Sequence, residues 1–257
     1  MTLMLSHGLS DTGVARLHNE DAFRIDGESG LYVVADGMGG HTHGEVASQI
    51  AVKTIGDFFS DRADRPVASC SDGSDLQPHS VDFKTAIELA HQAMLQAINE
   101  DLRLQGMGTT VAGIVVQDGI VAVGHVGDSR VYRLRDGQME LLTEDHSWVN
   151  EQVVAGYLTE EQARTHPLRN VVTRALGGEA AVVADLQETP VCKGDLYLIC
   201  SDGLTAMLSD LDIQARLTRG LPLTETCQKL IDDSNARGGV DNVTAILVRI
   251  EEDSSSA

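Results

Sequence analysis

The sequence has few aromatic residues and few basic ones. Aromatic residues make up 4% of the 257 residues, and 19 Lys and Arg stand against 39 Asp and Glu, so the formal net charge is −20. An acidic surface repels phosphate backbones and anionic lipid headgroups. The composition therefore argues against a nucleic-acid-binding protein and against a membrane-surface protein.

Long apolar runs and a targeting segment are also lacking. No stretch of about 18 consecutive apolar residues occurs, and the N-terminus has no basic flank followed by an apolar core, as a signal peptide would. The four cysteines, at positions 70, 192, 200 and 227, show no C-x-x-C spacing. We therefore expect a reduced, cytoplasmic protein without a transmembrane span.

Apolar periodicity comes in blocks rather than in strict alternation of strands and helices. Hydrophobic residues make up 42% of the chain, enough for one domain over residues 1–250, followed by a mobile acidic tail at 251–257. A polar, turn-rich loop is predicted at 61–80, and a helix after it with Asp82 as its N-cap. Strands are predicted at 2–11, within 22–36, and at 109–117, 120–126, 131–135, 181–188, 195–200 and 242–250. Helices are predicted at 44–60, 82–104, within 147–170 and within 203–236. Such blocks predict an α+β fold of stacked sheets with helices outside.

One feature recurs four times: an apolar segment ends in an aspartate followed by a small or amide residue. These aspartates are Asp36 in VVADG, Asp128 in HVGDS, Asp202 in LICSDG and Asp241 in GGVDN. A single aspartate at a strand end usually forms a turn. Four of them leaving a core together would repel one another and lose solvation unless positive charge neutralised them. None of the four motifs contains a lysine or an arginine, and Arg130 directly follows HVGDS, so divalent cations are the simplest counter-charge.

The donor atoms constrain the metal. Carboxylate oxygens without accompanying Cys or paired His suit Mg²⁺ or Mn²⁺ rather than Zn²⁺. The glycine after Asp36 lets the backbone approach closely, so the Gly37 carbonyl can also bind a cation. Water between two cations about 3.5–4 Å apart has a lowered pKa and is a ready nucleophile for in-line phosphoryl displacement.

Two other motifs near Asp36 suggest different chemistry. The stretch DGMGGHTHG departs from the dinucleotide-binding pattern G-x-G-x-x-G, because Thr42 stands at the third glycine position and no Rossmann alternation follows. His41-Thr42-His43 is similar to the H-x-H metal pair of amidohydrolases, whose barrel alternates strands and helices. Neither alternative agrees with the block pattern.

These motifs together carry a family resemblance. The sequence resembles the metal-dependent protein phosphatases of the PPM family, also called type 2C, in their single-domain bacterial form. The resemblance implies a four-layer α/β/β/α sandwich, in which two antiparallel β-sheets pack face to face with helices on both outer sides. The matching segments are GVARLHNEDA (13–22), VADGMGGH (34–41), GTT (108–110), VGDSRVYRL (126–134), LTEDHS (142–147), RNVVTRALG (169–177), GDLYLICSDGL (194–204) and GGVDNVT (238–244).

The resemblance also implies roles for individual residues. Asp36 would bridge two Mn²⁺ or Mg²⁺ ions, Asp202 and Asp241 would complete the first site, and the Gly37 carbonyl would bind the second ion. Asp128 with Asp202 is similar to the pair that holds a third, weaker ion in bacterial members.

Four further positions are assigned by the same resemblance. Glu20 and Asp21 would orient metal-bound waters. Arg16 matches the phosphate-binding arginine, whose planar fork engages two phosphoryl oxygens. His41 matches the histidine proposed to protonate the leaving oxygen, although a structural role for it stays open.

One residue and one segment differ from, or vary within, the sequence pattern of the family. His125 stands where many relatives carry asparagine, and we expect it to pack rather than to touch metal-bound water. Residues 144–170 match the flap beside the cleft of bacterial members, which would influence substrate choice.

The resulting hypothesis is a monomeric hydrolase acting on phosphoserine and phosphothreonine in proteins, by direct attack of a metal-activated water without a phosphoenzyme. No cysteine has an arginine at C-x₅-R spacing, which agrees with this reaction. Its expected partners are a Hanks-type serine/threonine kinase and that kinase's substrates. Two alternatives are a pseudophosphatase, which should have lost metal aspartates, and a partner switch acting on an anti-sigma antagonist.

Overall fold

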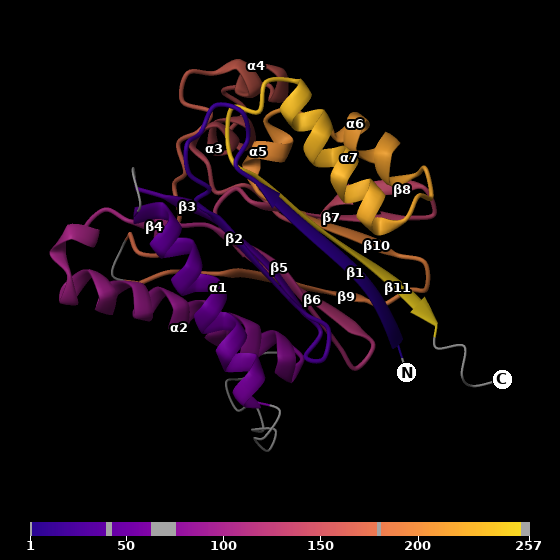
Figure 1. The fold of residues 1–257 in the computed structure, drawn as a ribbon, viewed down its shortest axis with the longest axis horizontal. Coiled ribbons are helices and arrows are strands. Elements are labelled where there is room, and N and C mark those ends of the chain that lie inside the picture. Colours follow the sequence, from indigo (N-terminus) through magenta and orange to yellow (C-terminus); the bar gives the residue numbers. More distant parts are fainter. Residues whose placement is uncertain (1, 40–42, 63–75, 179–180, 253–257) are drawn as a thin grey trace.

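The computed structural model describes residues 2–39, 43–62, 76–178 and 181–252. Groups of consecutive strands are followed by groups of consecutive helices along the chain (Figure 1). The strands are β1 (Thr2–Asp11), β2 (Asp21–Asp26), β3 (Leu31–Met38), β4 (Gly108–Thr109), β5 (Val111–Gln117), β6 (Ile120–Val126), β7 (Arg130–Arg135), β8 (Gln138–Leu141), β9 (Asp185–Pro190), β10 (Leu196–Cys200) and β11 (Val243–Glu252). The helices are α1 (His43–Arg62), α2 (Pro78–Glu100), α3 (Trp148–Val154), α4 (Glu160–Thr165), α5 (Asp202–Thr205), α6 (Asp210–Leu217) and α7 (Leu223–Ala236), with a 3₁₀ turn η1 (Leu102–Leu104).

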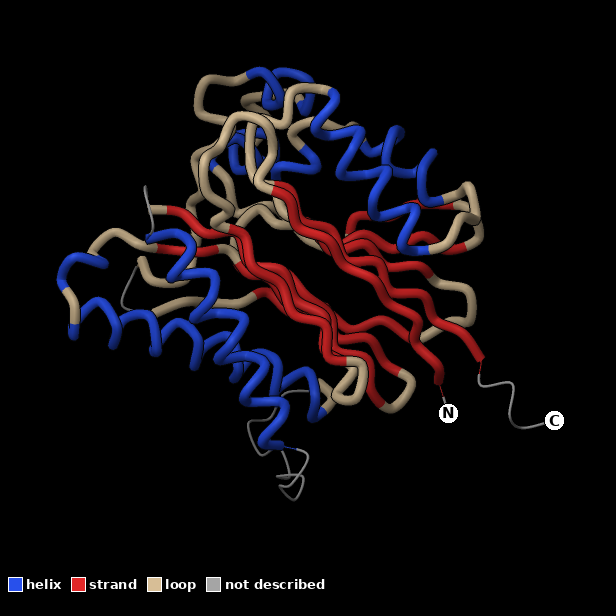
Figure 2. Tube along the Cα trace, in the orientation of Figure 1, coloured by secondary structure: helices blue, strands red, loops and turns tan. Residues whose placement is uncertain are grey.

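The strands form two antiparallel sheets. The first has the order β1-β11-β10-β7-β8, and the second has the order β2-β3-β5-β6-β9, with β4 added beside β3. Figure 2 shows the two bands of strands next to each other in the middle of the molecule, with helices along both outer sides. The expected four-layer α/β/β/α sandwich is confirmed.

Alternation along the strands explains why the sheets are covered on both faces. In β3, Leu31, Val33 and Ala35 pack against α1 and α2, whereas Tyr32 and Val34 face the other sheet. Successive side chains of a strand point to opposite faces, so a continuously apolar strand fills two cores. The same division in β11 places one set of side chains against α5, α6 and α7 and the other set between the sheets.

Several boundaries differ from the predictions. Helix α2 begins at Pro78 with Gln77 as its N-cap, so the assignment of Asp82 as the cap was wrong. Proline is well suited to the first helical position, because its missing N–H would have no intrahelical partner there. Strand β8 was not predicted from the sequence, because QMEL lacks a clear alternation.

Two predicted segments fall partly outside the described residues. The loop at 61–80 contains residues 63–75, which are not described, and the structure has helix on both sides of them. The predicted tail at 251–257 begins too early, because β11 continues through Glu252, and residues 253–257 are not described. Among the described residues, Cys192, Cys200 and Cys227 are free thiols, and no helix is long and apolar enough to cross a membrane.

Candidate metal centre and active site

The predicted aspartates gather where strands of the two sheets end. Asp21 and Asp36 lie directly opposite each other on β2 and β3 of the second sheet. Asp202 follows β10, and Asp241 precedes β11, the neighbouring strand of the first sheet. Asp128 follows β6. Ser201, directly before Asp202, donates to Asp21, and repulsion from Asp21, Asp202, Asp128 and Asp241 adds to burial in raising the pKa of Asp36, so these carboxyls lie in one region.

Asp36 is held by its backbone. Its N–H donates to the Thr110 hydroxyl at 3.1 Å, and its carbonyl accepts from the Thr109 hydroxyl at 2.8 Å and from the Thr110 N–H at 2.9 Å. Loss of solvation, followed by repulsion from Asp21 and the other aspartates, raises the pKa of Asp36 well above its ordinary value. The fold therefore fixes a carboxyl where negative charge is unfavourable without a cation.

Asp21 is buried and incompletely hydrogen-bonded. Its Oδ2 accepts from the hydroxyls of Ser201, directly after β10, at 2.7 Å and of Thr244, on β11 of the other sheet, at 2.6 Å. Its Oδ1 is buried and has no hydrogen-bond partner among the described residues. Desolvation raises the pKa of Asp21 to about 7, and the two hydroxyl bonds only partly offset it.

Two further aspartates complete the cluster: Asp202 follows β10 of the first sheet, and Asp128 follows β6 of the second. Burial, with repulsion from Asp241, raises the pKa of Asp202 to about 6. Burial, with repulsion from Asp202, raises the pKa of Asp128 well above its ordinary value. Both carboxyls line the same pocket.

Gly37 occupies a position that excludes any side chain. A Cβ there would lie 2.1 Å from the Gly44 carbonyl oxygen and 2.6 Å from the Glu20 carbonyl oxygen. The Gly37 N–H donates to that Glu20 oxygen at 3.1 Å. Desolvation is the main cause that raises the pKa of the Glu20 carboxyl, and Arg16 opposes it. Glu20 therefore lies beside the cluster.

Arg16 reaches the cluster through an ion pair. Its Nη2 donates to Asp241 Oδ2 at 2.6 Å, while its side chain keeps 48% of its exposure. The predicted phosphate-binding residue thus lies at the rim of the carboxyl cluster and is open to a ligand from solvent. The predicted general acid, His41, lies outside the described residues.

A pocket of about 380 Å³ adjoins this cluster. Its walls include Asp128 and Asp202 at the cluster and residues of α3 and α4 in the predicted flap. Arg130, at the start of β7, donates to both carboxylate oxygens of Asp145, at 2.8 and 2.7 Å, and so fastens the beginning of the flap. A substrate bound in the pocket would touch both the flap and the carboxyl cluster.

The family is decided by comparison with known proteins. The sequence profile of the protein phosphatase 2C family matches residues 14–242. The chain belongs to this family. A serine/threonine phosphatase of Listeria innocua is 37% identical over 242 residues, which span 93% of each chain. The crystal structure of the Mycobacterium tuberculosis serine/threonine phosphatase PstP/Ppp superposes with a TM-score of 0.85 at 34% identity, over 97% of this chain and 99% of the other.

Another solved structure bears on the metal. A PstP catalytic domain in complex with two manganese ions has a TM-score of 0.85 and 32% identity, over 98% of this chain and all of its own. The resemblance seen in the sequence, the fold it implied and the activity class of a protein-serine/threonine phosphatase, a phosphoric monoester hydrolase, are confirmed.

The residues present fit divalent cations. Raised pKa values of neighbouring buried carboxyls show that the ionised forms lack sufficient counter-charge. The buried, unpartnered Oδ1 of Asp21 is an acceptor that a metal-bound water could satisfy. Oxygen-only donors agree with Mn²⁺ or Mg²⁺.

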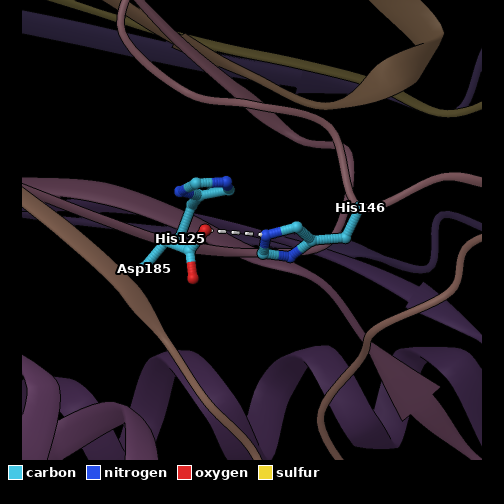
Figure 3. Close-up of side chains that lie close together, drawn as sticks. All are labelled: His125, His146 and Asp185. Carbon is cyan, nitrogen blue, oxygen red and sulfur yellow. Dashed lines mark hydrogen bonds and ion pairs between the residues drawn. The ribbon is translucent and has the colours of Figure 1, made fainter. Parts of the chain in front are cut away.

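A second group of potential ligands does not fit a cation. Among the described residues, His125, His146 and Asp185 place one ligand atom each within 4.8 Å of one another (Figure 3). However, His146 Nδ1 accepts the Gly127 N–H at 3.0 Å, so its neutral ring carries the proton on Nε2. That nitrogen cannot then bind a metal, and the Arg174 guanidinium, 2.9 Å from Asp185, would repel one.

Sequence reasoning missed Asn242, which orders the loop that carries Arg16. Its Oδ1 accepts the Glu20 N–H at 2.8 Å, and its Nδ2 donates to the carbonyls of Thr12 and His18, each at 2.9 Å. The signal available was the amide directly after Asp241 in GGVDN. That residue joins two segments more than 220 positions apart, which a local pattern cannot reveal.

Proposed function

We propose that this enzyme removes phosphate from phosphoserine and phosphothreonine in proteins with two Mn²⁺ or Mg²⁺ ions. Asp36 would bridge the ions, Asp202 and Asp241 would complete one site, and the Gly37 carbonyl would contribute to the other. Asp128 and Asp202 would hold a third, weaker ion. The observation that carries this proposal is the cluster of carboxyls where the two sheets meet, with Asp21 opposite Asp36 and the buried Asp21 Oδ1 lacking a partner among the described residues; burial raises the pKa values of this cluster.

The chain's own groups suit this reaction. Bound cations supply Lewis acidity that lowers the pKa of water near neutral pH. Arg16 offers a guanidinium fork to the phosphoryl oxygens. A cation at Asp241 would compete for the Oδ2 that Arg16 now contacts at 2.6 Å, which would release that fork for the substrate. Glu20 and Asp21 would accept hydrogen bonds from metal-bound water and so orient it.

The flap and the partners belong to the same proposal. The pocket beside the flap over 144–170 would receive the protein segment around the phosphorylated residue. A Hanks-type kinase and its substrates are the proposed partners, and the monomeric state and cytoplasmic location remain predictions. His41 stays a proposed general acid on the resemblance alone.

The test compares purified wild-type protein with Asp36→Asn and Asp202→Asn. Both variants should lose turnover of a phosphothreonine peptide and of p-nitrophenyl phosphate in Mn²⁺, because each removes a proposed ligand. The control is Asp118→Asn, at an exposed turn with φ of 48°, a conformation that asparagine tolerates.

Chelator should stop the wild-type reaction reversibly. Full turnover in EDTA would refute the metal mechanism. An autophosphorylated Hanks-type kinase and a phosphorylated anti-sigma antagonist, offered in parallel, distinguish the two partner hypotheses.

A further inference from the structure

Two buried histidines stack between the flap and the second sheet. His125 on β6 and His146, just before α3, have ring centroids 4.7 Å apart and planes inclined by 20°. Their exposed fractions are 5% and 7%. His125 Nε2 lies 2.8 Å from the Glu144 carbonyl oxygen and donates to it. The packing expected for His125 is therefore found together with a specific hydrogen bond to the flap.

His146 is fixed to the residue that precedes Asp128. The ring Nδ1 of His146 accepts the Gly127 N–H at 3.0 Å, and the backbone N–H of His146 donates to the Gly127 carbonyl at 3.0 Å. The other ring nitrogen, Nε2, lies 3.1 Å from Asp185 Oδ2 and donates to it (Figure 3). The tautomer with the proton on Nε2 satisfies the contacts with Gly127 and Asp185. Arg174 Nη1 also lies 3.1 Å from Nε2, and it donates instead to Asp185 Oδ1 at 2.9 Å.

Gly127 has a backbone conformation and a close neighbour that exclude a side chain. Its φ is 106°, and a Cβ there would lie 2.5 Å from Thr110 Cγ2. Thr110 in turn holds the backbone N–H of Asp36, and its hydroxyl lies 2.7 Å from the hydroxyl of Ser129. The two hydrogen bonds with His146 therefore fix both peptides of Gly127, the residue before Asp128. The ring accepts from the Val126–Gly127 peptide, and the backbone N–H donates to the Gly127–Asp128 peptide.

We propose that His146 is a positioning residue for Asp128, and that its Nδ1 is the atom through which it acts. By accepting the Gly127 N–H, the ring fixes the Val126–Gly127 peptide, while the His146 backbone N–H fixes the Gly127–Asp128 peptide that follows. Together they turn the Asp128 carboxylate toward the other ligands of the weakest cation. His125 supports this arrangement by stacking on the ring. The inference rests on the proposed metal centre and adds to it a residue outside the carboxyl cluster.

A simpler interpretation is that the histidines only fill space. Two substitutions of His146 separate these interpretations, because each keeps one half of its hydrogen bonding. His146→Asn can place a carbonyl oxygen near the position of Nδ1 and retain an acceptor for Gly127. His146→Gln extends its amide toward the position of Nε2, near Asp185, and leaves the Gly127 N–H without an acceptor.

A matched control exists in α2. His91 is buried to 1% exposure, and its Nδ1 accepts the Gly177 N–H at 3.1 Å, as His146 does for Gly127. His91→Gln therefore removes an equivalent backbone bond away from Asp128. Its loss of stability measures the cost of such a bond by itself.

The experiment titrates chelator-treated full-length protein with Mn²⁺ by calorimetry and by the electron paramagnetic resonance signal of free Mn²⁺. Asp128→Asn identifies the weakest site by its loss. We expect His146→Gln to weaken that site by about 10-fold or more, in the range found for residues that orient metal ligands. His146→Asn should stay within about threefold of wild type, and His91→Gln should leave Mn²⁺ binding unchanged.

Equal stability losses in His146→Gln and His91→Gln, with unchanged Mn²⁺ binding in both, would overturn the inference. So would an Asp128→Asn variant that binds Mn²⁺ as wild type does. If His146→Gln does not fold, His125→Phe replaces it: the stack stays, the donor to Glu144 is lost, and the weakest site should bind several-fold less tightly. Unchanged Mn²⁺ binding at the weakest site of His125→Phe would also overturn the inference. Failure of the proposed function would instead appear as wild-type protein without Mn²⁺-dependent turnover.

Discussion

Removal of divalent cations should make the stability of this enzyme fall as the pH rises. The perturbation is chelation, which leaves the carboxyl cluster without its proposed counter-charge. Asp21 sets the scale, because burial raises its pKa from 3.8 to about 7. A group whose pKa is higher in the folded state binds protons more tightly there, so its stabilising effect is present at low pH and is lost through neutrality.

The magnitude follows from the two pKa values. A difference between 3.8 and about 7 corresponds to about 4 kcal/mol, of which about 3 kcal/mol is lost between pH 5 and pH 8. Because the neighbouring carboxyls share their repulsion, protonation of one relieves the others, and we take Asp21 as the scale for the whole cluster. For a chain of this length, the melting temperature should fall by roughly 10 °C.

The assay is urea unfolding and thermal melting of chelator-treated protein at pH 5 and pH 8. Saturating Mn²⁺ should abolish the loss at pH 8, because it replaces protons as the counter-charge. Asp36→Asn should reduce the loss, because it removes one of the interacting charges, whereas Asp118→Asn, in an exposed turn, should not. Chelated wild-type protein that is equally stable at both pH values, or more stable at pH 8, would refute the reasoning.

Two further predictions concern contacts beside the cluster. Gly37→Ala should lower the free energy of unfolding by at least about 2 kcal/mol and abolish Mn²⁺-dependent turnover, because its Cβ would lie 2.1 Å from the Gly44 carbonyl oxygen. Gly27→Ala is the control: its Cβ would lie 3.9 Å from its nearest neighbour, the Tyr32 hydroxyl, and it should be close to neutral in the same unfolding and activity assays. Asp145→Ala should cost about 3–5 kcal/mol in urea unfolding, because it leaves Arg130 without its bidentate partner, and Arg130→Met combined with Asp145→Leu should recover much of it. Neutral Gly37→Ala or Asp145→Ala variants would contradict these expectations.

The architecture was predictable where one strand fills two cores. Runs such as Leu31–Ala35 are apolar at every position, which indicates burial on both faces, and the structure divides them between the helices and the other sheet. The order of strands within each sheet could not be read in the same way. Strand β1 pairs with β11, more than 200 residues away, and nothing local in either segment specifies that partner.

The carboxyl cluster was predictable because its sequence pattern repeats. The residues that hydrogen-bond to the cluster were not predictable, because they follow no repeated pattern. Asp36, Asp128 and Asp202 each come directly after or shortly after a run of apolar residues, so the sequence shows them as a set. The contacts of Asp21 with Ser201 and Thr244 depend on two sheets meeting, and a hydroxyl has no distinctive spacing in a sequence. The tautomer of His146 likewise follows only from the direction of the Gly127 N–H.

The position of the cluster between the sheets has an energetic consequence. Asp21 and Asp36 belong to the second sheet, whereas Asp202 and Asp241 flank strands of the first. Without cations, the carboxyls repel across this boundary, and the hydroxyl bonds from Ser201 and Thr244 to Asp21 oppose that repulsion. A cation bound by Asp36 together with Asp202 would instead join the two sheets through charge-neutralised contacts. Since the cation binds the folded arrangement, the same binding energy that assembles the catalytic centre would also hold the sandwich together.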